Sequence, residues 1–207
     1  GTDAEYAAFA EALRSASVPV WLAPGNHDDS AKMQRRFALP SRDGRCDYLV
    51  ELPGARLVVL DSTRSGREDG ALDDTQLEWL DQQLDSTPSI VAMHHPCIAL
   101  GGKAFDSIRL DDDSREGLRG VVTTALGRGA RIHALVSGHA HMSCFAEFAG
   151  AKVIIAPSSA YEFGLSDGVF SYQIGEPQYM EYSWSETGDD FLARVITVND
   201  ALWRVMR

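Results

Sequence analysis

Residues 132–141 read IHALVSGHAH, a short apolar run that ends in a glycine and two histidines one residue apart. An apolar run of this length followed by a polar loop is typical of a buried strand. The same arrangement occurs twice earlier: VWLAP leads into GNHD at residues 25–28, and IVAM leads into HHP at residues 94–96. The chain therefore repeats one unit, a strand that ends in a loop carrying histidine.

Helical patterns fill the stretches between these units. Thr2 with Glu5 three residues later is a capping box in front of a helix, and leucines repeat at helical spacing from Leu77 to Leu84. Strands that alternate with helices through the first two-thirds of the chain predict an α/β sheet. The predicted strands are residues 19–23, 56–61, 90–94, 132–137, 152–156, 169–174 and 192–198, and the predicted helices are residues 4–16, 74–84 and 115–126.

The last third of the chain is richer in strands. Turns at residues 164–168 and 188–190 predict a second, antiparallel sheet that packs against the first. We therefore expect an α/β protein built as a sandwich of two mixed β-sheets flanked by helices. With 207 residues and no linker rich in proline, glycine or serine, residues 1–207 are expected to form a single domain.

Composition excludes several functional classes. The net charge of −11 argues against a nucleic-acid polymer as partner, because such contacts need clustered lysine and arginine. A small anionic substrate is compatible where bound cations reverse the local field. No apolar run approaches the roughly 20 residues that cross a bilayer, and no signal peptide is visible. Three cysteines without zinc-type spacing are predicted to be free, buried thiols in a reducing compartment, so we expect a cytoplasmic protein without a membrane partner.

The histidine loops carry the chemistry. Five of the six histidines fall in the three loops, and strand ends in an open α/β sheet are where ligands bind. Imidazoles with an amide or carboxylate oxygen suit zinc, iron, manganese or cobalt, and the lack of cysteine argues against a structural zinc site. In residues 138–141 we expect an extended loop that points both histidines to one side, with Gly138 allowing a tight turn.

Each motif has a plainer interpretation when it stands alone. Asn-His-Asp after a strand is common turn chemistry, and His-His-Pro alone says little. The three motifs together, in this order and each at a strand end, favour one shared site. His133 lies inside an apolar run, so we interpret it as a satisfied core or edge histidine.

The order GNHD, HHP and GHAH resembles the calcineurin-like metallophosphoesterase superfamily. The closer resemblance is to its cyclic-nucleotide (Icc/CpdA-like) and glycerophosphodiester phosphodiesterases. Pro24, the Leu-Asp-Ser at residues 60–62, the Leu-Glu-Trp-Leu at residues 77–80 and Pro157 support it. It covers residues 1–160 well and the remainder loosely, and it implies a four-layer α/β/β/α fold.

The resemblance also implies a metal centre with two divalent ions, drawn from manganese, iron, zinc or cobalt. Asn26, His94 and His139 are implied to bind the second metal, and His141 the first. The implied reaction is in-line attack on phosphorus by a hydroxide that bridges the two metals.

Catalytic roles follow from the same resemblance. His27 is implied to face the phosphate and to donate a proton to the leaving oxygen, with Asp28 orienting its ring. His95 is implied to be a neighbour of the metals and not a ligand.

One part of the family pattern is missing. The family begins with an Asp-x-His strand end and a Gly-Asp-x-x-Asp loop, and this chain starts without Met at the helix that follows that loop. We interpret the domain as incomplete at its N-terminus, without its first strands and without half of its metal ligands. Asp28, Asp29 and Asp61 have other expected roles and do not replace the bridging carboxylate. Residues 1–207 alone are therefore expected to bind at most about one metal and to be inactive, with an unpaired sheet edge that favours a homo-oligomer.

Three functions remain open. The first is a metal-dependent phosphodiesterase acting on small phosphodiesters, either a cyclic nucleotide such as cAMP or a glycerophosphodiester. The alternatives are a phosphomonoesterase of the same superfamily and a non-catalytic binding scaffold, which has no reason to keep five residues of the correct types. Loops 63–70 and 101–113 are expected to shape substrate choice, and we interpret Arg64, Arg67 and Lys103 as solvated surface charges.

Overall fold

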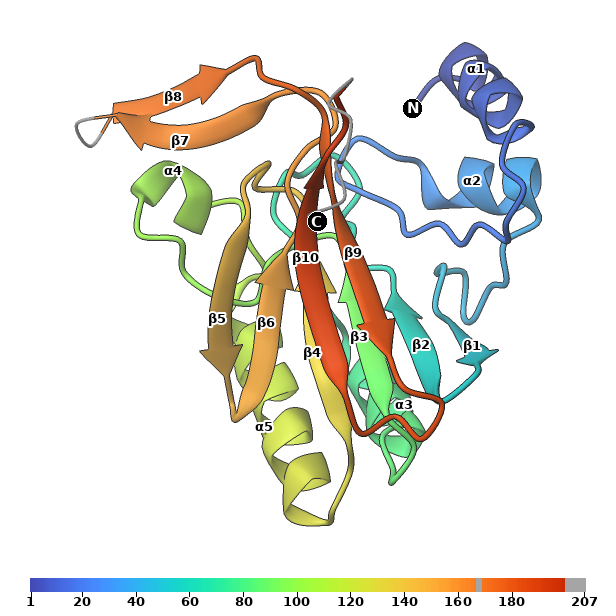
Figure 1. Ribbon diagram of the computed structural model, residues 1–207, viewed down its shortest axis with the longest axis vertical. Coiled ribbons are helices and arrows are strands. Elements are labelled where there is room, and N and C mark those ends of the chain that lie inside the picture. The colour runs from blue at the N-terminus through green and yellow to red at the C-terminus, as the bar shows by residue number, and fades with distance from the viewer. Residues whose placement is uncertain (167–168, 200–207) are drawn as a thin grey trace, which may run out of the picture.

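The computed structural model describes residues 1–166 and 169–199 and contains a central six-stranded sheet (Figure 1). The strand order is β1-β2-β3-β4-β6-β5. The inner strands β2, β3, β4 and β6 run parallel, whereas β1 and β5 pair antiparallel at the two edges. The strands are β1 (Tyr48–Leu52), β2 (Ala55–Leu60), β3 (Ser89–Met93), β4 (Ile132–Ser137), β5 (Cys144–Phe148) and β6 (Ala151–Ile155).

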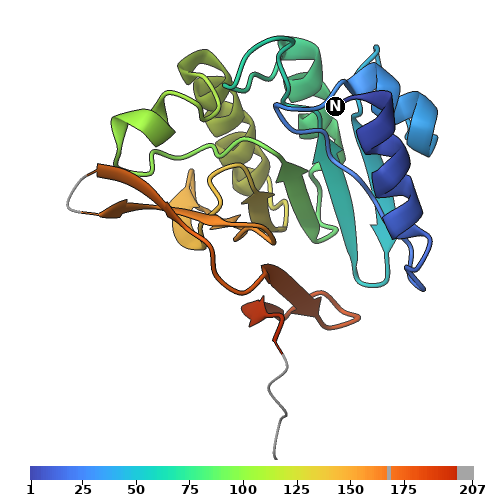
Figure 2. The same ribbon diagram turned by 90° about the horizontal axis from the view of Figure 1, so that it is seen from above.

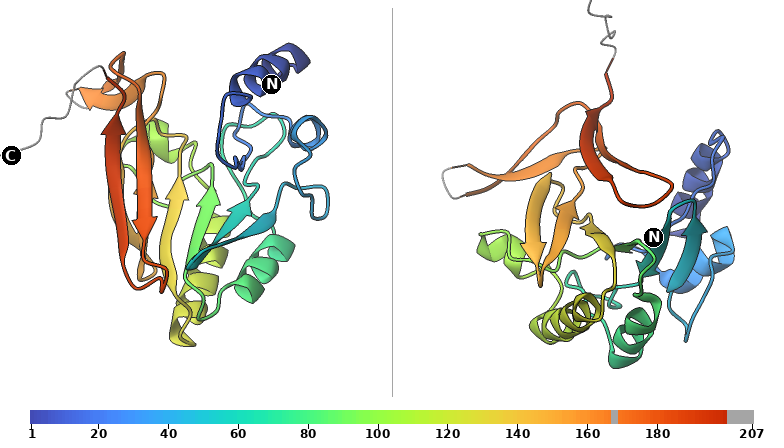
Figure 3. Two further views of the ribbon diagram at one scale, coloured as in Figure 1. Left: turned by 45° about the vertical axis from the view of Figure 1, so that its right-hand side comes forward. Right: turned by 60° about the horizontal axis from the view of Figure 1, so that its bottom comes forward.

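Helices and a second sheet cover opposite faces of the central sheet. Helices α3 (Asp74–Gln83) and α5 (Asp112–Gly127) lie on one face, and the antiparallel pair β9 (Gln178–Trp184) and β10 (Phe191–Thr197) lies on the other (Figures 2 and 3). The remaining elements are α1 (Asp3–Leu13) and α2 (Ser30–Phe37) beyond the β1 edge, α4 (Lys103–Asp106), and the hairpin of β7 (Glu162–Ser166) and β8 (Val169–Gln173) (Figure 1).

The main core lies between the sheet and the two helices α3 and α5. Leu80 of α3, Leu118 of α5 and Val91 of β3 are fully buried there. Burying one such side chain contributes roughly 1.5–3 kcal/mol. On the opposite face, His133 of β4 stacks on Phe191 of β10, with ring centroids 4.8 Å apart, so the second sheet packs on side chains of the first.

The turn that joins β9 and β10 is fastened to the turn that joins β1 and β2. The Trp184 indole N–H donates to the Pro53 carbonyl over 2.7 Å. A Cβ on Gly54 would come within 2.6 Å of the Glu186 carbonyl oxygen, and one on Gly188 within 2.4 Å of the Pro88 ring. Glycine is required at both positions because backbone approaches backbone.

These observations confirm the expected fold class, a mixed α/β protein whose sheets are flanked by helices. The capping box of Thr2 and Glu5 is present, and the three cysteines are free. The three predicted helices and six of the predicted strands are present with shifts of a few residues at their ends. The predicted turn at 164–168 and the single-domain prediction for 1–207 fall partly outside the described residues. None of the described helices has the length and hydropathy needed to cross a membrane.

One predicted strand is wrong. Residues 19–23 form no strand, because strand geometry needs a partner for its backbone groups. In place of a strand partner, a side chain bonds to this segment: the Tyr48 hydroxyl donates to the Leu22 carbonyl over 2.9 Å. Prediction also missed β1, β5, β7 and β9, together with the helices α2 and α4, whose apolar patterns are short or interrupted by polar residues.

Candidate active site

Two of the histidine loops begin where neighbouring parallel strands end. His94 directly follows β3, and Gly138 directly follows β4. The Gly138 amide donates to the His94 carbonyl over 3.1 Å, so the two loops are joined by their backbones. Parallel pairing therefore places both loops at one edge of the sheet, the upper edge in Figure 1, as expected for the carboxyl ends of such strands.

All three histidine loops meet in a cluster of donor atoms. His94 Nε2 lies 3.0 Å from Asn26 Oδ1 and 3.0 Å from His139 Nδ1. Ring nitrogens of His94, His95 and His139 lie within 4.8 Å of one another. The structure thus brings together three of the four predicted metal-site residues, Asn26, His94 and His139, and their assignment as ligands stays a prediction.

Burial keeps these imidazoles neutral. Loss of hydration, the largest cause, and the charges of the surrounding histidines together lower the pKa of His94 to about 2. Loss of hydration is also the largest cause that lowers the pKa of His139 to about 4. A neutral imidazole offers one lone pair, which is the form that binds a metal.

His95 is fully buried beside the cluster and is held by its own partners. Its Nδ1 lies 2.8 Å from Ser62 Oγ, and its Nε2 lies 3.1 Å from the Glu68 carbonyl oxygen. The carbonyl can only accept, so Nε2 carries the hydrogen and Nδ1 accepts from the Ser62 hydroxyl. Both ring nitrogens of His95 are therefore engaged by protein groups, and its role as a neighbour of the metals and not a ligand stays a prediction.

Two glycines give the rings the room that they need. A Cβ on Gly25 would lie 2.9 Å from His94 Cε1, and a Cβ on Gly70 would lie 2.4 Å from His95 Cγ. Real Cβ atoms do not approach this closely, so each glycine is fixed by a ring that presses on its backbone.

The backbone of residues 138–141 differs from the prediction. His139 and His141 have φ values of 65° and 48°, in the left-handed region that residues with a Cβ seldom adopt. The prediction of an extended loop is therefore wrong. The backbone turns at His139 and His141, and not at Gly138 as predicted. Strained backbone of this kind clusters at functional sites, where surrounding structure enforces it.

His141 lies at the rim, outside the group of three histidines. Its ring stacks on Phe163, with centroids 4.9 Å apart and planes 18° from parallel, and it contacts Tyr161 at 4.7 Å. Its Nδ1 is buried without a hydrogen-bond partner in the described part of the chain, as is Nε2 of His139. Loss of hydration lowers the pKa of His141, so it too offers a lone pair.

His27 is exposed and lines a cavity of about 490 Å³ together with Tyr6 and Asp28. The Asp28 carboxylate accepts from the Gly25 amide over 2.8 Å and from the Tyr6 hydroxyl over 3.1 Å. Asp28 thus holds the loop in shape, and its predicted orientation of the His27 ring stays a prediction. Sequence reasoning missed Tyr6, whose hydroxyl also accepts from the Asp29 amide over 2.8 Å.

The carboxylates behind the site serve the scaffold. Asp61 is buried and accepts from the Cys46 amide and from Thr63. Burial raises the pKa of Asp47, which accepts from the Asp61 amide over 2.8 Å. Among residues 1–166 and 169–199 no Asp or Glu joins the three histidines at the same distance. The expectation that residues 1–207 alone are inactive stays a prediction.

The arginines of loop 63–70 lie at the surface, as expected, and are also ion-paired. Arg64 contacts Asp69 at 2.8 Å and Asp111 at 3.1 Å, and Arg67 contacts Asp69 at 2.6 Å. The hydrogen bond from Arg67 is the largest cause that lowers the pKa of Asp69. These pairs fix the loop that supplies the Glu68 carbonyl to His95.

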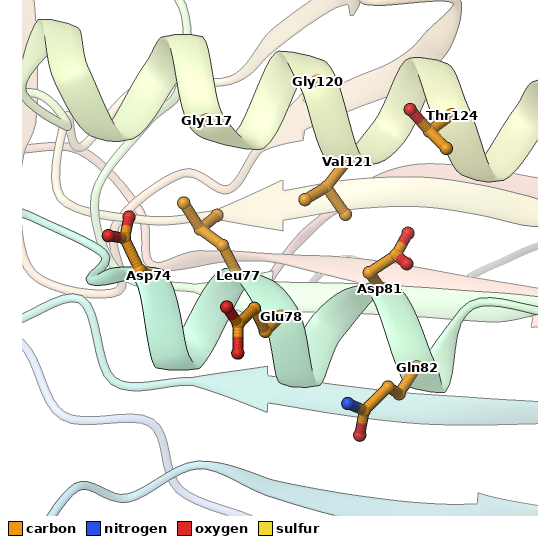
Figure 4. Close-up of a pocket in the computed structure, with 9 residues that line it drawn as sticks. All are labelled: Asp74, Leu77, Glu78, Asp81, Gln82, Gly117, Gly120, Val121 and Thr124. Atoms are coloured by element: carbon orange, nitrogen blue, oxygen red, sulfur yellow. The ribbon is translucent and has the colours of Figure 1, made fainter.

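A groove larger than the cavity beside His27 lies elsewhere on the described surface. Figure 4 shows it between α3 and α5, about 560 Å³ in volume, with acidic side chains such as Asp74 and Glu78 on α3 opposite Gly117 and Gly120 on α5. It contains none of the predicted site residues. Volume alone therefore does not locate the chemistry in this protein.

Similarity to known proteins agrees with the geometry. The chain is 27% identical over 195 residues to a probable glycerophosphodiester phosphodiesterase, GpdQ, of Arcobacter nitrofigilis, which covers 90% of this chain and 70% of the relative. It is 34% identical over 148 residues to a probable cyclic nucleotide phosphodiesterase of Rhodococcus erythropolis, covering 69% of this chain and 46% of the relative. It is 27% identical over 190 residues to the 3′,5′-cyclic adenosine monophosphate phosphodiesterase CpdA of Vibrio vulnificus, covering 90% and 66%.

The chain thus spans about half to two-thirds of the length of these relatives. Their names confirm the branch that the motifs indicated. A family model described as calcineurin-like phosphoesterase matches residues 2–143, a stretch that contains all three histidine loops. The chain therefore belongs to the calcineurin-like phosphoesterase family.

Proposed function

We propose that the protein containing this chain is a metal-dependent phosphodiesterase that hydrolyses small phosphodiesters, either cyclic nucleotides such as cAMP or glycerophosphodiesters. The observation that carries the proposal is the convergence of Asn26 Oδ1, His94 Nε2 and His139 Nδ1 from three separate loops. Relatives named for these two substrate classes support it. The free, mostly buried thiols favour a reducing, cytoplasmic setting.

The donor set fits a divalent cation. A neutral imidazole carries one hydrogen, so His94 Nε2 cannot make separate hydrogen bonds to both Asn26 Oδ1 and His139 Nδ1. A cation among these three atoms satisfies all of them, and neutral nitrogen with amide oxygen suits manganese, iron, zinc or cobalt. We assign Asn26, His94 and His139 to one ion and His141 to a second. When bound, the two ions supply the Lewis acidity that neutralises phosphoryl charge and activates water.

The chain's own residues then direct the reaction. Hydrolysis breaks one P–O bond, water adds oxygen to phosphorus, and the leaving oxygen takes a proton. We assign to His27, which is exposed and lines a cavity with Tyr6 and Asp28, the role of giving that proton to the leaving oxygen and of recovering one from water. A general acid of this kind contributes about 10²–10⁴-fold. Asp28, through its bonds to Gly25 and Tyr6, keeps the loop in position.

The test compares ester classes on the protein stripped of metal and then refilled. We expect hydrolysis of 3′,5′-cAMP or glycerophosphoethanolamine, and of bis-p-nitrophenyl phosphate, to stop with EDTA and to return with Mn²⁺. Faster turnover of p-nitrophenyl phosphate than of every diester would make the protein a phosphomonoesterase. Bound metal without any hydrolysis would instead favour the binding scaffold. His133→Asn, outside the site, is the control for His94→Ala.

A further inference from the structure

A row of aromatic rings borders the site at His141. Tyr161 and Phe163 contact the His141 ring at 4.7 and 4.9 Å, and they lie 5.2 Å from each other. The row continues to Phe170, 4.7 Å from Phe163, and to Tyr172, 6.3 Å from Tyr161. We call Tyr161, Phe163, Phe170 and Tyr172 the aromatic shelf. It is built on the β7–β8 hairpin and the residue before it, above α4 in Figure 1.

The shelf packs against a buried ring, and three of its own rings are exposed. Phe105 of α4 is 1% exposed and contacts Phe170 at 5.0 Å. Within the shelf, Phe170 is 43% exposed, Tyr161 is 39% exposed and Tyr172 is 69% exposed. Apolar ring surface held open to water beside converging polar groups is typical of a ligand site.

The backbone fixes the shelf relative to the histidines. The Phe163 amide donates to the His141 carbonyl over 3.0 Å, which ties β7 to the loop of residues 138–141. The Ser158 hydroxyl oxygen accepts from the Tyr161 amide over 3.4 Å and from the Ala160 amide over 3.1 Å. The Tyr161 ring is therefore held in contact with the His141 ring.

The position of His141 determines which part of a substrate can contact the shelf. The His141 ring contacts Tyr161 and Phe163 of the shelf, and His141 lies two residues after His139 in the same loop. A phosphate held among these histidines thus has the shelf next to it, within reach of a substituent that is joined to the phosphate through a sugar.

We propose that the aromatic shelf stacks the base of a nucleotide whose phosphate lies at the histidine cluster, with Tyr161 and Tyr172 as the exposed faces. This inference rests on the proposed function and narrows its substrate class to cyclic nucleotides. A nucleobase offers a flat π face that stacks on tyrosine, whereas a glycerol or ethanolamine group offers none. Stacking of this kind tolerates different bases, so the shelf selects for a base without fixing which one.

Binding measurements test the shelf without requiring turnover. In calorimetric titrations of the Mn²⁺-loaded protein, we expect AMP to bind more tightly than ribose 5-phosphate, which shares its sugar and phosphate and lacks the base. Tyr172→Ala and Tyr161→Ala should each lower the affinity for AMP by roughly tenfold. The affinity for ribose 5-phosphate should not change. Tyr172→Phe and Tyr161→Phe keep the ring and should bind AMP as the wild type does.

The matched control is Tyr179→Ala. Tyr179 is 48% exposed on β9, on the face opposite Tyr182, which stacks on Phe191, and its removal should not change AMP binding. Because Tyr172 is well exposed, its variant stays informative if Tyr161→Ala fails to fold.

Three outcomes would overturn the shelf. The first is that the wild type binds AMP and ribose 5-phosphate with equal affinity. The second is that the alanine variants lose equal affinity for both ligands. The third is that the alanine variants change their oligomeric state and bind AMP as the wild type does. The last would make this surface a contact between copies of the chain. Diester hydrolysis that survives any of these results would leave the proposed function standing, and its absence alongside normal AMP selectivity would remove the proposed function alone.

Discussion

The interior and the rim of the site differ in how far their side chains are exposed to solvent. In the interior, His94, His95 and His139 are packed ring against ring, with centroids 4.8–5.0 Å apart, and burial holds them neutral. At the rim, His27 and Tyr161 are exposed. Under the proposed function, the interior would hold a cation whether or not substrate is present, whereas the exposed rim residues would meet the substrate. Changes inside should therefore alter metal affinity, and changes at the exposed rim residues His27 and Tyr161 should alter turnover or selectivity with metal affinity unchanged.

The largest expected effect comes from removing an interior ring. His94→Ala deletes the nitrogen that faces both Asn26 and His139. Loss of groups that merely orient ligands already costs about 10–100-fold in metal affinity, so we expect a loss above that range for Mn²⁺, together with loss of metal-dependent hydrolysis. Calorimetric titration with Mn²⁺ measures it, with His133→Asn as control. Unchanged affinity in His94→Ala would break the distinction between interior and rim.

The next effect separates the rim from the metal. His27→Ala should leave Mn²⁺ affinity unchanged and lower kcat by about 10²–10⁴-fold for diesters with poor leaving groups. A nitrophenyl diester, whose leaving oxygen needs no proton, should lose much less. Steady-state assays on both kinds of ester check this. Equal losses would exclude His27 as the proton donor.

A smaller effect tests how tightly the interior is packed. Gly70→Ala places a Cβ against the His95 ring, and overpacking of this kind costs roughly 1–3 kcal/mol of unfolding free energy. The displaced ring lies 4.8 Å from His139, so Mn²⁺ affinity should fall as well.

Denaturant unfolding gives the measurement for Gly70→Ala, and Gly120→Ala is its control. Nothing lies within 4 Å of a Cβ at Gly120 in α5, so that variant should gain roughly 0.5–1 kcal/mol from helix propensity. If both variants behave alike, the interior is not packed as described.

The smallest effect concerns His133, which is buried away from the site. Loss of hydration is the largest cause that lowers its pKa, followed by the charges of Arg131 and Lys152. With the folded pKa below the unfolded value of about 6.5, the unfolded chain takes up the proton first. Stability from neutral His133 is therefore complete above pH 6.5 and declines as pH falls below it. His133→Asn should reduce this part of the pH dependence, measured by unfolding at pH 7 and pH 5, and an identical pH profile would contradict it.

Sequence reasoning located the loops after β3 and β4 because a strand that ends in a polar loop is a local pattern, whereas residues 25–28 follow a segment that forms no strand. It predicted that Asn26, His94 and His139 lie together at one sheet edge, and the structure brings their side chains together. It could not foresee the left-handed backbone at His139, because packing around the loop imposes that conformation. The interpretation of His133 as satisfied was also wrong in one respect, since its buried Nε2 has no partner among the described residues.

Partners that are distant in sequence account for the other omissions. Ser62, Glu68 and Gly70 hold His95 from a loop about thirty residues earlier, and no pattern of residue types links them. Antiparallel edge strands such as β1 and β5 are short, with partly exposed side chains. Their existence depends on a neighbour that offers backbone hydrogen bonds.

The fastening between the β9–β10 turn and the β1–β2 turn sets an order of events during synthesis. Trp184 and Pro53 are 131 positions apart, so the six central strands leave the ribosome well before the indole exists to meet its carbonyl. Until then the face of β4 that carries His133 has no cover, and Phe191 arrives later still. A newly made chain therefore passes through an interval in which one face of its main sheet is bare, and chaperones that bind apolar surface have their opportunity during that interval.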